Sequence, residues 1–334
     1  MAAQQGIWRT HRVRRYTRCR PANAGMGPRT QRRGLREEKI KAGKFPVDVA
    51  MVERLIAAQF PQWTDLPIRH VAQDGWDNWT FHLGDRMKVR LPTGEGYAEQ
   101  AQKEVHWLPK LAPLLPLPIP VPIGVGQPND EFPWLWSIYD WIEGAPATRA
   151  LAGEVRFAED IAGFLNVLQR VDTTGGPPPG QHCYLRGADF ATAYGAEARK
   201  FVAELGDRID NAGAVAVLDA AEAARTVAPV WVHGDVAVGN LLLRDGKLAA
   251  VIDFGCSAVG DPACDLVMGW VFFTGAAREA FRRTVDADAG TWARARGWAL
   301  WKAALLAATG QVTHPADAAP FEVIEAVITD HQGA

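Results

Sequence analysis

The stretch HGDVAVGNLLLRDGKLAAVIDFG, residues 233–255, decides the fold of this 334-residue chain. It contains two polar loops, and each loop lies beside a short apolar run that predicts a buried strand. The first loop carries Asp235 and Asn240, and the second carries Asp253 within an Ile-Asp-Phe-Gly motif. Two carboxylates and an amide on neighbouring loops predict a site that binds a metal and a phosphate group.

The order of these three side chains is typical of phosphoryl transfer. One carboxylate must receive the proton of the attacked hydroxyl, and oxygen ligands must hold Mg²⁺ against the phosphates of the nucleotide. Asp235 is therefore predicted as the catalytic base, and Asn240 and Asp253 are predicted as the metal ligands. His233 is expected to brace the loop without taking part in the chemistry.

The motifs together resemble the aminoglycoside phosphotransferase family. The chain has H-G-D where protein kinases have H-R-D, then D-x-x-x-x-N, I-D-F-G, and G-D-P-x-x-D-L at 260–266. The resemblance is densest over 230–270, extends over about 45–310 and leaves out 1–44. It implies a small-molecule kinase that uses Mg²⁺ and takes ATP or GTP as its co-substrate.

The fold class expected from the resemblance and the chain pattern is α+β. We expect a bilobal protein-kinase-like fold, with a small antiparallel sheet in the first lobe and a larger, mainly helical second lobe. Residues 45–142 are predicted to form the nucleotide-binding lobe, ending in a hinge. Residues 143–334 are predicted to form the helical lobe, with the catalytic and metal loops and the acceptor site.

The first 44 residues have a different composition from the rest. They hold 13 Lys or Arg but only two acidic residues, and they lack a sustained apolar period. Residues 1–44 are therefore predicted to be a basic, disordered extension. A nucleic-acid-binding arm, a transit peptide and a late translation start at Met26 or later are the alternatives. The late start is preferred, and nucleic-acid binding is not expected, because nothing downstream resembles a nucleic-acid module.

A turn and a strand of the first lobe are the expected phosphate contacts. The resemblance implies a turn that covers the nucleotide, and here that turn contains Gly75 and Asn78, although an ordinary hairpin explains the same residues. The resemblance also implies a basic residue on the third strand. Lys88 and Arg90 share one face of that strand because side chains alternate. The Arg-Leu-Pro ending favours Arg90.

A helix predicted over 97–108 is expected to supply the glutamate that pairs with this strand cation. Glu104 is preferred because apolar residues with core-facing spacing lie beside it, and Glu99 is the competitor. Pro109 is expected to end the helix, because proline lacks the N–H that a helix needs.

The segment 137–144 resembles the hinge that binds the nucleotide base through backbone groups. The expected contacts are the carbonyl of Asp140 and the N–H of Ile142. A buried strand without a ligand is the alternative interpretation.

The acceptor is expected to be a small molecule with a hydroxyl group, such as an aminoglycoside or a macrolide. A kinase of choline or homoserine, or a nucleotide-binding pseudokinase or scaffold, are the alternatives. Tryptophans of the late helices, Trp298 and Trp301 among them, either line an acceptor cleft or pack in the core. The sequence does not decide between ATP and GTP, and it does not indicate an oligomeric state.

A cytoplasmic location without membrane insertion is expected. No run of 18 or more apolar residues occurs, and the first residues lack the apolar core of a secretion signal. The four cysteines form no C-x-x-C pair, so free thiols in a reducing compartment are expected.

Overall fold

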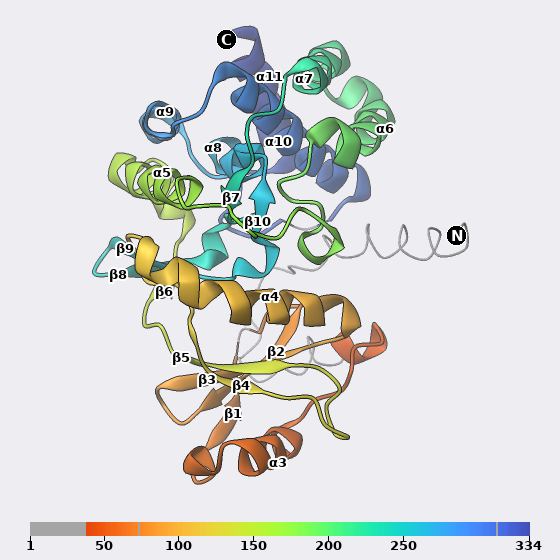
Figure 1. Ribbon diagram of the computed structural model, residues 1–334. Helices are drawn as coiled ribbons and strands as arrows, with labels where there is room; N and C mark the ends of the chain where they lie inside the picture. The colour runs from red at the N-terminus through yellow and green to blue at the C-terminus, as the bar shows by residue number, and fades with distance from the viewer. Residues whose placement is uncertain (1–37, 73, 312) are drawn as a thin grey trace.

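Two lobes make up the chain, and helix α4 lies between them in the computed structural model (Figure 1). The structure describes residues 38–72, 74–311 and 313–334. The first lobe is built on a five-stranded antiparallel sheet with the order β1-β2-β3-β5-β4, and the second lobe is mainly helical. The predicted α+β, bilobal architecture is therefore confirmed. Residues 1–37 of the predicted extension lie outside the described residues.

The sheet of the first lobe is covered on both faces. Helix α3 (Val49–Gln59) buries its apolar side against one face, where Val89 and Leu91 belong to the same hydrophobic cluster. Helix α4 (Glu95–Leu111) packs on the other face. Because side chains alternate along a strand, Lys88 and Arg90 point towards α4 and the second lobe. The strands are β1 (Ile68–His70), β2 (Asn78–Leu83), β3 (Met87–Pro92), β4 (Pro122–Gly126) and β5 (Trp136–Asp140).

Helix α4 continues beyond the end that its proline predicted. Pro109 lies inside the helix, which runs on to Leu111, so the expected end at this residue is wrong. Proline at this position removes only one backbone hydrogen bond, the one that an N–H at residue 109 would donate to the carbonyl four residues earlier. Leu108 and Leu111 are both buried, and their packing favours one more turn.

Residues 38–44, the end of the extension that was predicted to be disordered, are instead folded against the first lobe. The side chain of Lys39 is fully buried, and its Nζ lies 2.6 Å from Oδ2 of Asp74 and 2.8 Å from the carbonyl oxygen of Asn78. The Lys44 ammonium lies 3.8 Å from the centre of the Tyr97 ring. The contacts of Lys39 tie the extension to the turn that precedes β2 and to the start of β2, and the contact of Lys44 ties it to α4.

The second lobe is organised around helix α10. This helix packs against α6, α7 and α11. Two small sheets of the lobe, β7 with β10 and β6-β8-β9, carry the loops that face the first lobe. The helices are α5 (Val155–Gln169), α6 (Ala196–Leu205), α7 (Asn211–Ala223), α8 (Met268–Val271), α9 (Gly275–Thr284), α10 (Ala289–Thr309) and α11 (Pro320–Gln332). The strands are β6 (Ala145–Pro146), β7 (Val230–Val232), β8 (Leu241–Arg244), β9 (Lys247–Val251) and β10 (Ala258–Gly260).

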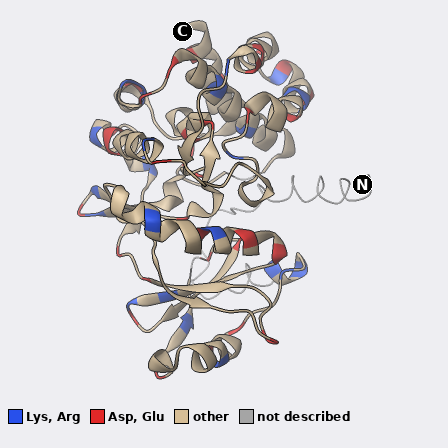
Figure 2. Ribbon diagram, viewed as in Figure 1, with Lys and Arg blue, Asp and Glu red and all other residues tan. Residues whose placement is uncertain are grey.

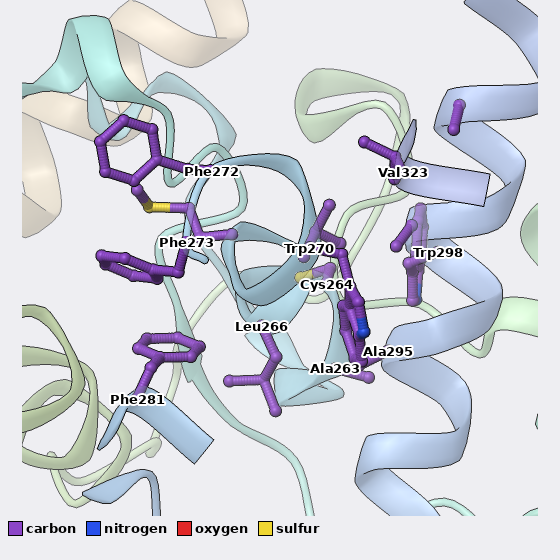
Figure 3. Packing of buried hydrophobic residues seen from close by; sticks show 14 of the residues in the cluster. Ala263, Cys264, Leu266, Trp270, Phe272, Phe273, Phe281, Ala295, Trp298 and Val323 are labelled. Carbon is purple, nitrogen blue, oxygen red and sulfur yellow. The ribbon is translucent and has the colours of Figure 1, made fainter. Parts of the chain in front are cut away.

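The tryptophans of the late helices belong to the core of this lobe. Trp298 and Trp301 are fully buried, and Trp270 is 2% exposed. Figure 3 shows Trp270 and Trp298 among the packed apolar side chains that join α8 to α10. Of the two interpretations that the sequence left open for them, core packing is the one that the structure favours.

Candidate active site

One loop of the second lobe, between β7 and β8, holds Asp235 and Asn240 side by side. The Nδ2 of Asn240 donates to the backbone carbonyl of Asp235 at 2.9 Å and to its carboxylate Oδ2 at 3.2 Å. The backbone N–H of Ile252 donates to the carbonyl of Asn240 at 2.9 Å, which links this loop to the one that carries Asp253. Strands β8 and β9 form the hairpin between the loops, so both loops leave the same end of the sheet.

The backbone of Asp253 is left-handed, with φ at +67°. Such a conformation costs a non-glycine residue about 1–3 kcal/mol and is concentrated at functional sites. Here it accompanies a carboxylate that is aimed at the other lobe: Oδ1 of Asp253 lies 3.2 Å from Nη2 of Arg90. The side chain of Asp253 is 48% exposed, so part of this carboxylate remains accessible to a ligand.

Arg90 joins Asp253 to helix α4. Its Nη1 lies 3.2 Å from Oε2 of Glu104, and the hydroxyl of Tyr139 donates to the same oxygen at 3.3 Å. Burial by itself lowers the pKa of Arg90, but the carboxylates of Glu104 and Asp253 more than offset this and raise it above its ordinary value. The structure thus pairs Arg90 with Glu104. The competing Glu99 is exposed, 4.0 Å from Nδ1 of His182.

Lys88, the alternative strand cation, lies in a different environment. Its ammonium is 5.8 Å from the centre of the Tyr139 ring and 6.0 Å from that of the Trp141 ring. Burial, with a contribution from the charge of Arg90, lowers the pKa of Lys88 to about 8. Lys88 therefore lies near the aromatic rings of residues 139 and 141, whereas Arg90 contacts the loop that carries Asp253, the predicted metal loop.

The turn that contains Gly75 and Asn78 is tied to both lobes. The Oγ1 of Thr93 donates to the carbonyl of Asp77 at 3.1 Å. The hydroxyl of Tyr184, in the second lobe, donates to the Asp77 carboxylate at 3.3 Å. Gly75 is exposed, and no atom lies within 4 Å of the position where its side chain would begin. The structure gives neither Gly75 nor Asn78 a contact with Asp235, Asn240 or Asp253.

The hinge residues lie at the end of β5. Asp140 pairs with Met87 of β3, and the N–H of Trp141 donates to the carbonyl of Arg86 at 2.7 Å. Among the described residues, no hydrogen bond takes up the N–H of Ile142.

A buried aspartate supports the loop of residues 233–240, which is the predicted catalytic loop. Asp265 is fully buried and accepts hydrogen bonds at 2.7 Å from the backbone N–H groups of His233 and Gly234. Burial raises the pKa of Asp265, although the two N–H groups act against this shift. Gly234 has φ at +79°, and a side chain there would begin 2.3 Å from the carbonyl oxygen of Cys256, so only glycine fits. The side chain of His233 also braces the loop, because its Nε2 lies 3.1 Å from the carbonyl oxygen of Ile252.

Residues 69–298 match the profile of the phosphotransferase enzyme family. This chain belongs to that family. The resemblance stated from the sequence is thereby confirmed, and the protein is a small-molecule phosphotransferase that acts on a hydroxyl group. A search of curated protein sequences found no match.

Solved structures share the fold of this phosphotransferase. The GDP complex of wild-type aminoglycoside 2′-phosphotransferase-IIIa aligns with a TM-score of 0.61 at 14% identity, covering 85% of this chain and 100% of that chain. The GDP and kanamycin complex of an aminoglycoside 2″-phosphotransferase aligns with a TM-score of 0.59 at 15% identity, covering 84% and 96%. Macrolide 2′-phosphotransferase MphH from Brachybacterium faecium aligns with a TM-score of 0.53 at 21% identity, covering 83% and 96%.

The phosphotransferase has a donor set that fits Mg²⁺. The amide nitrogen of Asn240 is turned towards Asp235, so its oxygen is left for a metal, and Asp253 keeps an accessible carboxylate oxygen. Magnesium is usually held by one or two protein oxygens together with phosphates and waters. Among the described residues, no group of three or more His, Cys, Asp and Glu side chains could hold a metal.

Sequence reasoning missed several lobe-to-lobe contacts of this phosphotransferase. Among them are the hydrogen bond from Tyr184 to Asp77 and those from Lys103, whose Nζ donates to the carbonyls of Gly255 and Ser257. Gln100 likewise donates to the carbonyl of His182. The partners are far apart in the sequence, and backbone carbonyls leave no trace in residue identity.

Proposed function

We propose that this phosphotransferase moves the γ-phosphate of ATP or GTP directly to a hydroxyl of a small molecule of the aminoglycoside or macrolide kind. The observation that carries the proposal is the continuous network from Glu104 through Arg90 to Asp253. It joins the helix of one lobe to the metal loop of the other, beside the loop with Asp235. A cation and two carboxylates that meet across the lobes suit a bound metal–nucleotide.

In the proposed reaction, the acceptor hydroxyl oxygen attacks the γ-phosphorus. The bond from that phosphorus to the bridging oxygen breaks, and ADP or GDP leaves. Asp235 receives the proton that the hydroxyl loses, and its position is set by the hydrogen bond from Asn240. Asn240 and Asp253 would hold Mg²⁺, which supplies positive charge for the phosphate oxygens when it is bound.

The remaining residues are proposed to bind the nucleotide. Arg90, held by Glu104, would contact the α- and β-phosphates, and the turn with Gly75 and Asn78 would cover them. The carbonyl of Asp140 and the N–H of Ile142 would bind the base. The support for the hinge contact is the N–H of Ile142, which has no partner among the described residues.

The similar solved structures support an acceptor of the aminoglycoside or macrolide kind. The similar solved structures include complexes with kanamycin, streptomycin and gentamicin, and also macrolide phosphotransferases.

A cytoplasmic location is part of the proposal. Cys183, Cys256 and Cys264 are free and buried, as is ordinary for a reducing compartment. Within the described part of the chain, no helix combines the length and the apolar character needed to span a bilayer.

The test is a phosphate-transfer screen of the purified protein over aminoglycosides, macrolides, choline and homoserine, with ATP and GTP in parallel. Mass spectrometry of each acceptor identifies the phosphorylated product, and Asp235→Asn serves as the inactive control. Phosphorylation of an aminoglycoside or a macrolide is expected. Transfer only to choline or homoserine would move the protein to metabolite kinases, and nucleotide binding without any transfer would support a pseudokinase.

A further inference from the structure

Helix α4 carries two neighbouring charged residues whose partners belong to different lobes. Glu104 pairs with Arg90, and Lys103 lies directly before it in the helix. Figure 2 shows charges of both signs along α4, which lies between the sheet and the second lobe. The two residues therefore sit at the surface where the lobes meet, but they contact different partners.

Lys103 makes its contacts with backbone oxygens of the second lobe. Its Nζ donates to the carbonyl of Gly255 at 2.7 Å and to the carbonyl of Ser257 at 2.6 Å. The residue is 8% exposed, and none of the described carboxylates forms an ion pair with it. Burying an ammonium without a carboxylate costs several kcal/mol unless other acceptors compensate, so the two carbonyls are central to keeping this side chain inside.

The carbonyls that Lys103 binds belong to the metal loop. Asp253 begins this loop in its left-handed conformation, and a single turn over residues 254–256 leads from it to Ser257, whose N–H bonds back to the carbonyl of Phe254. A cation that holds the carbonyls of residues 255 and 257 thus restrains the whole turn. The direction in which the Asp253 carboxylate points depends on that turn.

Helix α4 consequently reaches Asp253 by two routes. One route runs through side chains, from Glu104 to Arg90 to Asp253, at 3.2 Å for each ion pair. The other runs from Lys103 to the backbone two and four residues after Asp253. Gln100, one turn earlier, adds a tie to the second lobe by donating to the carbonyl of His182 at 2.8 Å, but it does not touch the metal loop through this bond.

We propose that Lys103 is a positioning residue for the metal site, and that it sets the distance between Arg90 and Asp253 by holding the metal loop from the opposite lobe. This inference rests on the proposed function, because the proposed function assigns the metal–nucleotide to this loop. A rigid cross-lobe tie keeps Asp253 ready for Mg²⁺ before any nucleotide arrives. Outer residues that orient metal ligands typically change metal affinity by 10- to 100-fold when they are lost.

The test compares Lys103→Met with Lys110→Met, which removes an exposed lysine from the same helix. Calorimetry measures the binding of ADP and GDP over a range of Mg²⁺ concentrations. The Mg²⁺ concentration for half-maximal binding is expected to rise at least about tenfold in Lys103→Met and to stay unchanged in Lys110→Met. In the absence of metal, amide hydrogen exchange of residues 253–257 is expected to become faster in Lys103→Met alone.

The outcomes separate positioning from simple stabilisation. A lower unfolding temperature for Lys103→Met, with unchanged Mg²⁺ dependence and unchanged exchange at 253–257, would overturn the proposal. If Lys103→Met does not fold, Lys103→Gln is measured in the same way, and behaviour equal to the wild type overturns the proposal as well. Because binding and exchange are measured without an acceptor, a failure of transfer in the acceptor screen counts against the proposed function and not against this inference.

Discussion

Two arginine–carboxylate networks in this molecule differ mainly in their access to solvent. Arg90 contacts Glu104 and Asp253, and the Asp253 side chain is 48% exposed. Arg294 of α10 contacts Asp261 through Nε and Nη2, and the exposed fractions of these two side chains are 0% and 4%. Arg294 is also bonded to the backbone carbonyl of Arg225. The first, open network joins the two lobes and is partly exposed to solvent. The second, sealed network is buried inside the second lobe.

The comparison shows how a carboxylate that can bind a ligand differs from a structural one, although both are paired with an arginine. In the sealed network both oxygens of Asp261 are engaged, since they accept from Arg294 and from the N–H of Ala263. In the open network Asp253 keeps an accessible oxygen. Burial and remaining hydrogen-bond capacity, rather than residue type, indicate which carboxylate can meet a ligand.

The largest effect is expected from Asp235→Asn, which removes the proposed base beside the open network. The asparagine keeps the size of the side chain but accepts no proton, so kcat should fall by about 10²–10⁴-fold. Nucleotide affinity and the free energy of unfolding should stay close to those of the wild type, since Asp235 is not deeply buried. Transfer rates, calorimetry and chemical denaturation measure the three quantities. Full transfer activity in this variant contradicts the assignment.

Arg294→Met should have the next largest effect, and it should act on stability. It leaves the buried Asp261 carboxylate without its partner, which typically costs about 3–5 kcal/mol of unfolding free energy. Chemical denaturation measures this loss. The control is the double variant with Asp261→Asn, which removes the unpaired charge and should recover part of the stability. An unchanged unfolding midpoint for Arg294→Met would show that the network is not sealed.

Arg90→Lys should affect the nucleotide more than the fold. Lysine keeps the charge but has no planar fork, so it cannot contact both Glu104 and Asp253 simultaneously, whereas Arg90 does. A charge-assisted hydrogen bond contributes about 1.5–3 kcal/mol, so the KM for the nucleotide should rise about 10- to 100-fold. Steady-state kinetics with ATP and GTP measures this rise, and Arg69→Lys on the exposed edge strand is the matched control. An equal loss of unfolding free energy in both variants, without a KM change, argues for a purely structural Arg90.

The smallest effect concerns Lys88 and its dependence on pH. Its pKa is about 8 in the folded protein against 10.5 ordinarily, so between these values the unfolded chain binds more protons. Stability should therefore rise with pH across this window, because the folded state no longer carries the cost of a buried charge. Lys88→Met lacks this cost, so its stability advantage over the wild type should shrink from pH 7 to pH 10. Denaturation at several pH values tests this; a constant difference contradicts it.

The parts of the site that the sequence predicted are those that depend on local spacing. Asp235, Asn240 and Asp253 lie on two loops of one hairpin, so chain connectivity alone brings the loops together. The alternation of β3 put Lys88 and Arg90 on one face, because a strand has only two faces, and the Arg-Leu-Pro ending favoured Arg90.

The parts that the sequence did not predict depend on contacts between distant segments. Lys103 binds carbonyl oxygens, which every residue has, and Lys39 is buried by a turn far along the chain. The end of α4 was misplaced at Pro109 because packing of Leu111 outweighed a local rule. Tertiary contacts decided each of these cases, and a residue pattern does not contain them.

The central claim is that the open network at Asp253 holds the metal–nucleotide. Calorimetry of nucleotide binding to the wild type and to Asp253→Asn, each with and without Mg²⁺, tests it most directly. We predict that Mg²⁺ strengthens binding to the wild type and has almost no effect on the variant, whose unfolding free energy stays close to that of the wild type. An equal gain from Mg²⁺ in both proteins would contradict the account.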